Sequence, residues 1–169
     1  MTAAALIPYT AAMILDAIAR KHSDCALVRE VLVTDPDADR FASADAWVAA
    51  GRPGRMPQFE PTARRIDGLL FDGGQSRTAI EVKISRSDYL RETDAKRRVW
   101  RAITNRFVYA TPAGLLRPDE IPDGCGLWEV DDAGRVTIVK RAKSNRNPEP
   151  VPHQVLVALA YRLKRKGTS

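Results

Sequence analysis

Asp67, Glu81 and Lys83 carry the side chains whose types and spacing are best suited to chemistry in this chain of 169 residues. Two carboxylates can hold a hard divalent cation such as Mg²⁺, which keeps several waters and leaves room for a substrate phosphate. Lys83, two residues after Glu81, can orient or deprotonate a metal-bound water or stabilise developing negative charge. This combination is suited to metal-assisted hydrolysis of a phosphodiester bond.

The elements that must bring these residues together are two predicted strands within residues 64–85, joined by a Gly-rich turn. Asp-Gly and Gly-Gly dipeptides between two β-type runs are a hairpin signal. Side chains alternate between the two faces of a strand. If Phe71 pairs with Arg77 across the turn, the two carboxylates lie opposite each other on one face. A slip of one residue would put them on opposite faces.

Two carboxylates directly opposite each other destabilise a sheet, and a divalent cation between them makes the arrangement favourable. The alternative is an ordinary surface hairpin whose Glu81 and Lys83 are solvated or paired, since such spacings are common by chance. The local context favours a site. Apolar strand residues flank the acids, and Ser85, followed three residues later by Asp88, predicts a helix start.

Ile66-Asp67 and Glu81-Val82-Lys83 resemble the two signature elements of the PD-(D/E)XK nuclease superfamily, with Ile in the place of Pro. The series EVKISRSDYL, NRFVYATPAGLL and PDEIPDGCGLWEV is similar, more particularly, to the MmcB-type DNA-repair family and related phage-encoded nuclease-like proteins. The resemblance covers about residues 64–139, under half of the chain. The ordered series of three motifs is more specific than Glu81-Val82-Lys83 alone.

This resemblance implies a role for each matching residue. Asp67 and Glu81 would be metal ligands together with the carbonyl of Val82, and Lys83 would be catalytic. The cofactor would be Mg²⁺ or Mn²⁺, and the substrate would be DNA. Many restriction-like members are dimers, so a homodimer is a further expectation.

The resemblance also implies an α/β fold with a restriction-endonuclease-like αβββαβ core. Many members add a glutamate ligand from the first helix of that core, and this sequence has no clear counterpart. The candidates for an extra acidic ligand are Asp16, in the first predicted helix, and Glu30, in the first predicted strand. For Asp16 we favour a solvated position, because Asp side chains are usually exposed.

The predicted elements follow the order of that core. Apolar periodicity and β-branched runs predict a helix over 9–22, a strand over 26–33, the hairpin over 66–84, a helix over 86–104, a strand over 106–111, a hairpin over 127–139 and a helix over 155–164. A strand, a helix and a strand in succession make a parallel pair. We therefore predict one domain over 1–169 with a mixed central sheet and a C-terminal hairpin and helix. An insertion over 34–61, and a Pro-rich linker with a basic helix over 144–169, complete it.

The predicted helix over 86–104 is strongly basic and leaves the strand that carries Glu81 and Lys83. A basic helix in that position can follow a phosphate backbone and release counterions at each contact. A solvated basic face, partly neutralised by Glu92 and Asp94, is an equal alternative. The nucleic-acid-binding candidates are Arg86, Arg91, Lys96, Arg97, Arg98 and Arg101.

The predicted insertion over 34–61 combines loop residues with a short helix over 41–50. One hypothesis makes Arg52 and Arg55, with Trp47 and Phe59, one wall of a nucleic-acid groove. The alternative, which we favour, is a surface excursion packed by Trp47.

Composition limits the class of protein further. The net charge of +6 favours a polyanionic partner. Cys25 and Cys125 fit no metal spacing and are expected to be free thiols in a reducing compartment. With two histidines in the chain, a Cys/His zinc site or a Ser/His/Asp triad is disfavoured. The start of the chain does not resemble a signal peptide and no apolar run has membrane length, so we expect a cytoplasmic protein.

Three functions compete on these grounds. The first is a metal-dependent DNA endonuclease that hydrolyses phosphodiester bonds in DNA repair, recombination or phage DNA processing. The second is a non-catalytic DNA-binding repair-accessory module on the same fold, although pure binding has no need for opposed acids. The third is an interaction partner in a larger repair or phage complex, with its basic surface against an acidic protein.

Overall fold

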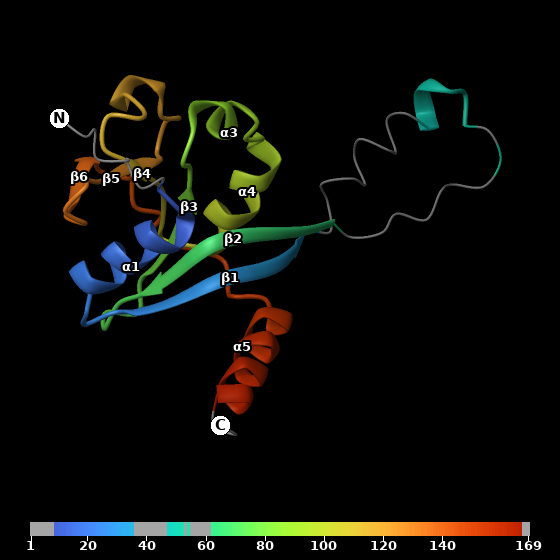
Figure 1. The fold of residues 1–169 in the computed structure, drawn as a ribbon. Helices are drawn as coiled ribbons and strands as arrows, with labels where there is room; N and C mark the ends of the chain where they lie inside the picture. The colour runs from blue at the N-terminus through green and yellow to red at the C-terminus, as the bar shows by residue number, and fades with distance from the viewer. Residues whose placement is uncertain (1–8, 36–46, 53, 55–61, 167–169) are drawn as a thin grey trace.

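A computed structural model describes residues 9–35, 47–52, 54 and 62–166 of the protein. The described chain is a mixed α/β fold around one six-stranded sheet (Figure 1). The strands lie side by side in chain order: β1 (Ala26–Asp35), β2 (Thr62–Phe71), β3 (Arg77–Val82), β4 (Arg106–Pro112), β5 (Gly126–Val130) and β6 (Val136–Lys140).

The strand directions make the sheet mixed, as predicted. Pairing is antiparallel from β1 to β2, from β2 to β3 and from β5 to β6, and it is parallel from β3 to β4 and from β4 to β5. In the β2–β3 hairpin Phe71 pairs with Arg77, which confirms the register predicted from the turn. The ladder continues to the pair just before Asp67 and Glu81, so these two residues occupy the next opposed positions.

Helices cover both faces of this sheet. They are α1 (Ala11–Lys21), α3 (Arg86–Leu90), α4 (Asp94–Ile103) and α5 (His153–Lys166), with a 3₁₀ turn at Pro118–Glu120 and a helical turn at 47–49. The hydroxyl of Thr10 caps α1 by accepting the backbone N–H of Met13 at 3.2 Å. Of the helix predicted over 41–50, residues 41–46 lie outside the described residues, as do Arg55 and Phe59 of the hypothetical groove wall.

The single helix predicted over 86–104 is wrong, because the chain forms two helices separated by a break at 91–93. Ser85 begins α3 as expected, and its hydroxyl accepts the backbone N–H of Asp88 at 3.1 Å. Thr93 has an extended backbone, with φ −108° and ψ 148°, and stands as the N-cap of α4. The interrupted apolar spacing around Thr93 reflects this break. The side chain of Glu92, inside the break, is 4% exposed.

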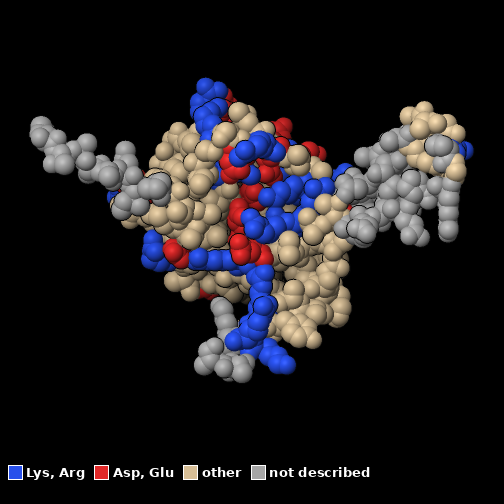
Figure 2. All heavy atoms as spheres, turned by 45° about the vertical axis from the view of Figure 1, so that its right-hand side comes forward, with Lys and Arg blue, Asp and Glu red and all other residues tan. Residues whose placement is uncertain are grey.

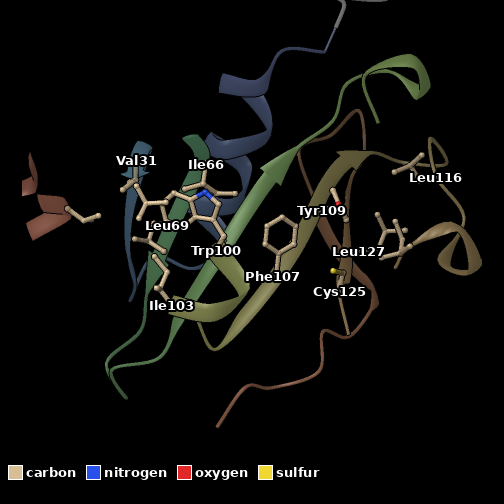
Figure 3. Packing of buried hydrophobic residues seen from close by; sticks show 14 residues of the cluster. Val31, Ile66, Leu69, Trp100, Ile103, Phe107, Tyr109, Leu116, Cys125 and Leu127 are labelled. Carbon is tan, nitrogen blue, oxygen red and sulfur yellow. The ribbon is translucent and has the colours of Figure 1, made fainter. Parts of the chain in front are cut away.

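Apolar side chains fill a layer on each side of the sheet. The apolar stripe of α1 packs on one side. On the other side Trp100 of α4 is fully buried beside Leu69 of β2 (Figure 3). Ala79 of β3 also lies in the α4 layer. Because side chains alternate along a strand, Glu81 and Lys83 are directed to this same side, under the α3–α4 segment.

The segment over 144–152, predicted as a linker, is held against the end of α4 and the start of β4. The backbone N–H of Asn145 donates to the carbonyl of Asn105 at 2.8 Å, and that of Glu149 donates to the carbonyl of Ala102 at 2.9 Å. These bonds make the segment part of the folded unit.

The C-terminal helix α5 contacts β1, the outermost strand of the sheet. The guanidinium of Arg162 donates to the backbone carbonyls of Arg29 and Glu30. Glu30 has a positive φ of 50°, which interrupts the regular alternation of β1 at this point. Within the described ranges no helix combines the length and the apolar character needed to cross a membrane.

Candidate active site

Glu81 and Lys83 lie at the end of β3 and are both buried. Their side chains are 3% and 6% exposed, and Lys83 Nζ donates to Glu81 Oε1 at 2.9 Å. The shared face of these two residues is as predicted. The alternative, a surface hairpin whose Glu81 and Lys83 are solvated or paired, describes them in part, because the two residues pair with each other but are buried and not solvated.

Asp67 reaches the same place from β2. Its Oδ2 accepts the backbone N–H of Val82 at 2.8 Å, and its side chain is 18% exposed. A carboxylate therefore binds the backbone N–H of Val82, two positions beyond Ile80, the last residue of β3 that is backbone-paired with β2. The negative charge of Asp67 is also close enough to raise the pKa of Glu81. The structure thus brings Asp67, Glu81 and Lys83 together.

Two further residues, not predicted for the metal and catalytic centre, complete a buried cluster. Glu92, in the break between α3 and α4, accepts from Lys83 through Oε2 at 2.7 Å. Lys96, on the first turn of α4, places Nζ 2.5 Å from Glu81 Oε1. We call Glu81, Lys83, Glu92 and Lys96 the charge cluster. Its two formal negative charges balance its two formal positive charges.

Burial and the neighbouring charges shift the pKa values of the cluster. Burial, and after it the charge of Asp67, raise the pKa of Glu81, while Lys96 and Lys83 oppose this shift. For Lys83 the largest single effect is burial, which lowers the pKa, but hydrogen bonds and charges of Glu92 and Glu81 outweigh it together and the pKa is raised. The cluster therefore keeps Lys83 in its charged form.

Two carboxylate oxygens of the cluster have unused acceptor capacity. Glu81 Oε2 and Glu92 Oε1 are both buried without a hydrogen-bond partner among the described residues. Leaving a buried charged acceptor unsatisfied costs free energy, so these oxygens favour a cation or a water. No group of three or more His, Cys, Asp or Glu side chains in the described chain is arranged to hold a metal. A metal site here would rest on two carboxylates with backbone and water, which is a donor set that Mg²⁺ accepts.

Three of the six predicted nucleic-acid-binding residues make close contacts with other side chains of the protein. Lys96 belongs to the charge cluster. Arg97 is 14% exposed, donates to Tyr109 Oη at 3.2 Å and pairs with Asp94 at 3.1 Å. Arg86 binds the carboxylate of Glu120 with two nitrogens. These contacts hold the α3–α4 segment to the sheet and to the β4–β5 crossover, and they leave less of the segment's charge for a ligand.

The other three candidates face solvent. Arg91 is 77% exposed, Arg98 is 57% exposed, and Arg101 is also exposed. Figure 2 shows basic and acidic side chains interleaved down one face of the molecule, so the surface is not uniformly positive.

A hollow of about 500 Å³ lies at the C-terminal end of α4. Its basic lining residues are Arg98, Arg101, Arg106 and Lys143. The side chains of Arg101, Arg106 and Lys143 make no ion pair with another described residue. Arg106 and Lys143 were not singled out from the sequence, because they are far from the basic helix along the chain.

The two candidates for an extra acidic ligand are both paired with arginine. Asp16, 52% exposed on α1, pairs with Arg29. Glu30, 69% exposed, lies 3.5 Å from Arg65. Arg65 also approaches Asp67 at 4.0 Å. The buried acid that joins Lys83 is instead Glu92, and no sequence signal indicated it, because it lies in the break between two helices.

Comparison with known proteins supports the fold and is silent on chemistry. No family model matches the chain, and no curated protein matches it. Among solved structures, the chain is similar to the SPO1766 protein of unknown function from Silicibacter pomeroyi, with a TM-score of 0.57 and 20% identity. The match covers 96% of this chain and 90% of that one. At this identity the similarity establishes a shared mixed α/β architecture.

Proposed function

We propose that the protein is a metal-dependent DNA endonuclease whose active site is formed by Asp67, Glu81 and Lys83. The observation that carries this proposal is the convergence of two acids and a lysine at the end of β3. Asp67 is bonded to the Val82 N–H at 2.8 Å, and Glu81 and Lys83 are buried beside it. Burying like charges close together is costly, and a site for a divalent cation gives a physical reason to retain them.

The order of elements supports the restriction-endonuclease-like interpretation of the fold. A helix, three antiparallel strands, a helical segment and a parallel strand follow one another as α1, β1, β2, β3, α3–α4 and β4. This is the αβββαβ series, with β5, β6 and α5 added at its end. The acids stand on its second and third strands.

The metal would be Mg²⁺ or Mn²⁺, held by Asp67, Glu81 and the carbonyl of Val82. The free oxygen of Glu81 supports this assignment. The Val82 carbonyl is suited as well, because the N–H and C=O of a strand residue point to the same side and its N–H faces Asp67. When bound, such an ion would polarise the phosphate and activate a water.

Lys83 would act as a fixed positive charge. Glu81 and Glu92 both accept from its ammonium, at 2.9 Å and 2.7 Å, and its pKa is raised. A charged lysine donates hydrogen bonds and cannot take a proton from water. Of the roles open to it, we therefore favour stabilisation of negative charge on the phosphate over deprotonation of the water.

The DNA backbone would run over the hollow at the end of α4. Arg98, Arg101, Arg106 and Lys143 line it and supply donors for phosphate oxygens. This assignment keeps Arg98 and Arg101 from the predicted set and moves the contact surface away from Arg86 and Arg97. A cytoplasmic location and a homodimer stay predictions.

The test is cleavage of duplex and single-stranded DNA by the full chain with Mg²⁺, with Mn²⁺ and with chelator. Asp67→Asn keeps the shape of the side chain and should lower the cleavage rate by roughly 100-fold or more, since it removes charge at the reacting centre. Asp119→Asn, on a side chain that is 72% exposed, is the matched control and should cleave normally. Cleavage that survives both chelator and Asp67→Asn would rule out this active site.

A second candidate is a DNA-binding module without catalysis, and the charge cluster is the observation that favours it. Its two lysines already balance its two glutamates, so the cluster is neutral without a metal. A module of this kind would bind DNA equally well with chelator and with Mg²⁺, and it would not cleave DNA with Mg²⁺ or with Mn²⁺.

A further inference from the structure

We propose that Lys96 is an internal counter-ion of Glu81 that competes with a divalent ion for this carboxylate, so that the ion must displace its ammonium to bind. This inference rests on the proposed function, because it concerns the same carboxylates. It assigns Lys96 a role beyond DNA contact, as the residue that sets the metal affinity.

Of the two lysines bonded to Glu81, Lys96 is the one whose ammonium group can move away from the carboxylate. Lys83 is 6% exposed and bonded to both Glu81 and Glu92. Lys96 is 26% exposed, and among the described residues its ion pair is with Glu81 alone. Its flexible four-carbon stem, starting from the first turn of α4, allows the ammonium to swing towards solvent without moving the helix.

The charges around Glu81 require that displacement. Glu81 Oε1 accepts from two ammonium groups, at 2.9 Å and 2.5 Å. A dication on the Asp67 side of Glu81 would lie close to both, and like charges at such distances repel strongly inside a protein. If Lys96 leaves, Glu81 and Asp67 face the ion with one fixed ammonium, Lys83, still tied to Glu92. Metal binding therefore includes the cost of breaking the Lys96–Glu81 bond.

The experiment is a calorimetric titration of Mn²⁺ into the full chain without DNA. Lys96→Met keeps most of the stem and removes the charge. It should bind Mn²⁺ roughly tenfold more tightly than the unmodified protein, the size expected for one hydrogen bond between charged groups. Arg135→Met removes a charge from a side chain that is 80% exposed on the β5–β6 turn, and it controls for net charge. Its affinity should match that of the unmodified protein.

A second measurement does not depend on the fold of a variant. In the unmodified protein, Mg²⁺ should shift the ammonium resonance of Lys96 and speed its proton exchange, whereas the resonance of Lys83 stays protected. Lys96→Arg, which keeps the positive charge, should bind Mn²⁺ more weakly than Lys96→Met.

The outcomes separate this inference from the proposed function. Equal Mn²⁺ affinity in Lys96→Met and the unmodified protein, or an unmoved Lys96 resonance, would overturn the role of Lys96 and leave the nuclease intact. Binding that appears only in Lys96→Met would support it. No Mn²⁺ binding in either protein would overturn both proposals.

Discussion

The β2–β3 and β5–β6 hairpins have similar turns, but they differ in whether helices cover their charged side chains. In the β2–β3 turn, Asp72 Oδ1 accepts the backbone N–H of Ser76 at 2.9 Å. In the β5–β6 turn, Asp131 Oδ1 accepts the backbone N–H groups of Ala133 and Arg135 at 3.0 Å and 2.9 Å. Each turn is thus closed by its leading aspartate, which accounts for the two similar sequence signals.

Glu81 of the first hairpin and the Asp131–Arg135 pair of the second lie in opposite environments. The first hairpin carries Glu81, 3% exposed under the α3–α4 segment. The second carries Asp131 and Arg135, which are 33% and 80% exposed and pair with each other at 2.8 Å. Exposed pairs contribute little to stability, whereas a buried charge that loses its partner is costly. The covering helices, and not the turns, therefore determine which hairpin can hold a reactive site.

The largest expected effect comes from removing the central charge of the first hairpin. Lys83→Met leaves Glu92 buried without its partner, so the free energy of unfolding should fall by about 3–5 kcal/mol. Urea denaturation measures this loss, with Arg135→Met on the second hairpin as the control that should leave the midpoint unchanged.

A double variant sharpens the same point. Adding Glu92→Gln to Lys83→Met removes the orphaned charge and should recover part of the lost stability. If Lys83→Met alone costs less than about 1 kcal/mol, the cluster behaves like a surface pair and the contrast between the hairpins fails.

An intermediate effect is expected from packing along the first hairpin. A Cβ added at Gly68 would lie 3.0 Å from Leu15 Cδ2 and 3.1 Å from Leu27 Cδ1, so Gly68→Ala should destabilise the protein by about 1–2 kcal/mol. Gly73, in the turn, has nothing within 4 Å of such a Cβ. Gly73→Ala should therefore be neutral or slightly stabilising, and thermal melts of both variants measure the difference. Equal losses in both variants would show that the strand is no more tightly packed than the turn.

The smallest expected effect is a pH dependence next to the second hairpin. The ring of His22 stacks on that of Trp128, with centroids 5.1 Å apart. Burial, followed by the charge of Lys21, lowers the pKa of His22 below its usual 6.5. The unfolded chain therefore binds the proton more readily, so His22 should lower the free energy of unfolding as pH falls below 6.5. Above that pH its effect should be absent.

His22→Phe keeps an aromatic ring on Trp128 and removes the titration. Urea midpoints of this variant and of the unmodified protein are compared at about pH 7.5 and about pH 5.5, on either side of the reference pKa of about 6.5. On going to the lower pH, the midpoint of the unmodified protein should fall more than that of His22→Phe. An equal change of midpoint with pH in both proteins would exclude a contribution from His22.

The sequence predicted the framework well because its strongest signals are local. Alternation along β3 and the Asp-Gly turn favoured the β2–β3 register that the structure has, although a one-residue slip stayed open, and Ser85 marked the start of a helix. The order of the other elements followed from apolar periodicity. The metal, the DNA substrate and the catalytic role stay predictions.

What the sequence could not predict depends on contacts between distant segments. Lys96 and Arg97 belong to a run of basic residues that is normally solvated, yet Glu81 and Tyr109 from the sheet draw them inward. Glu92 lies in the break before Thr93, and its burial follows from how α3 and α4 cross the sheet. Arg106 and Lys143 meet Arg101 because the chain returns after β5 and β6.

The contact of Arg162 with β1 also has a consequence for self-association. A strand at the margin of a sheet offers unpaired main-chain groups on which another polypeptide can align and start aggregation. By occupying the carbonyls of Arg29 and Glu30, the guanidinium of Arg162 removes two of those groups, and α5 shields the strand beside them. The basic C-terminal helix thus gives this margin a protective cover.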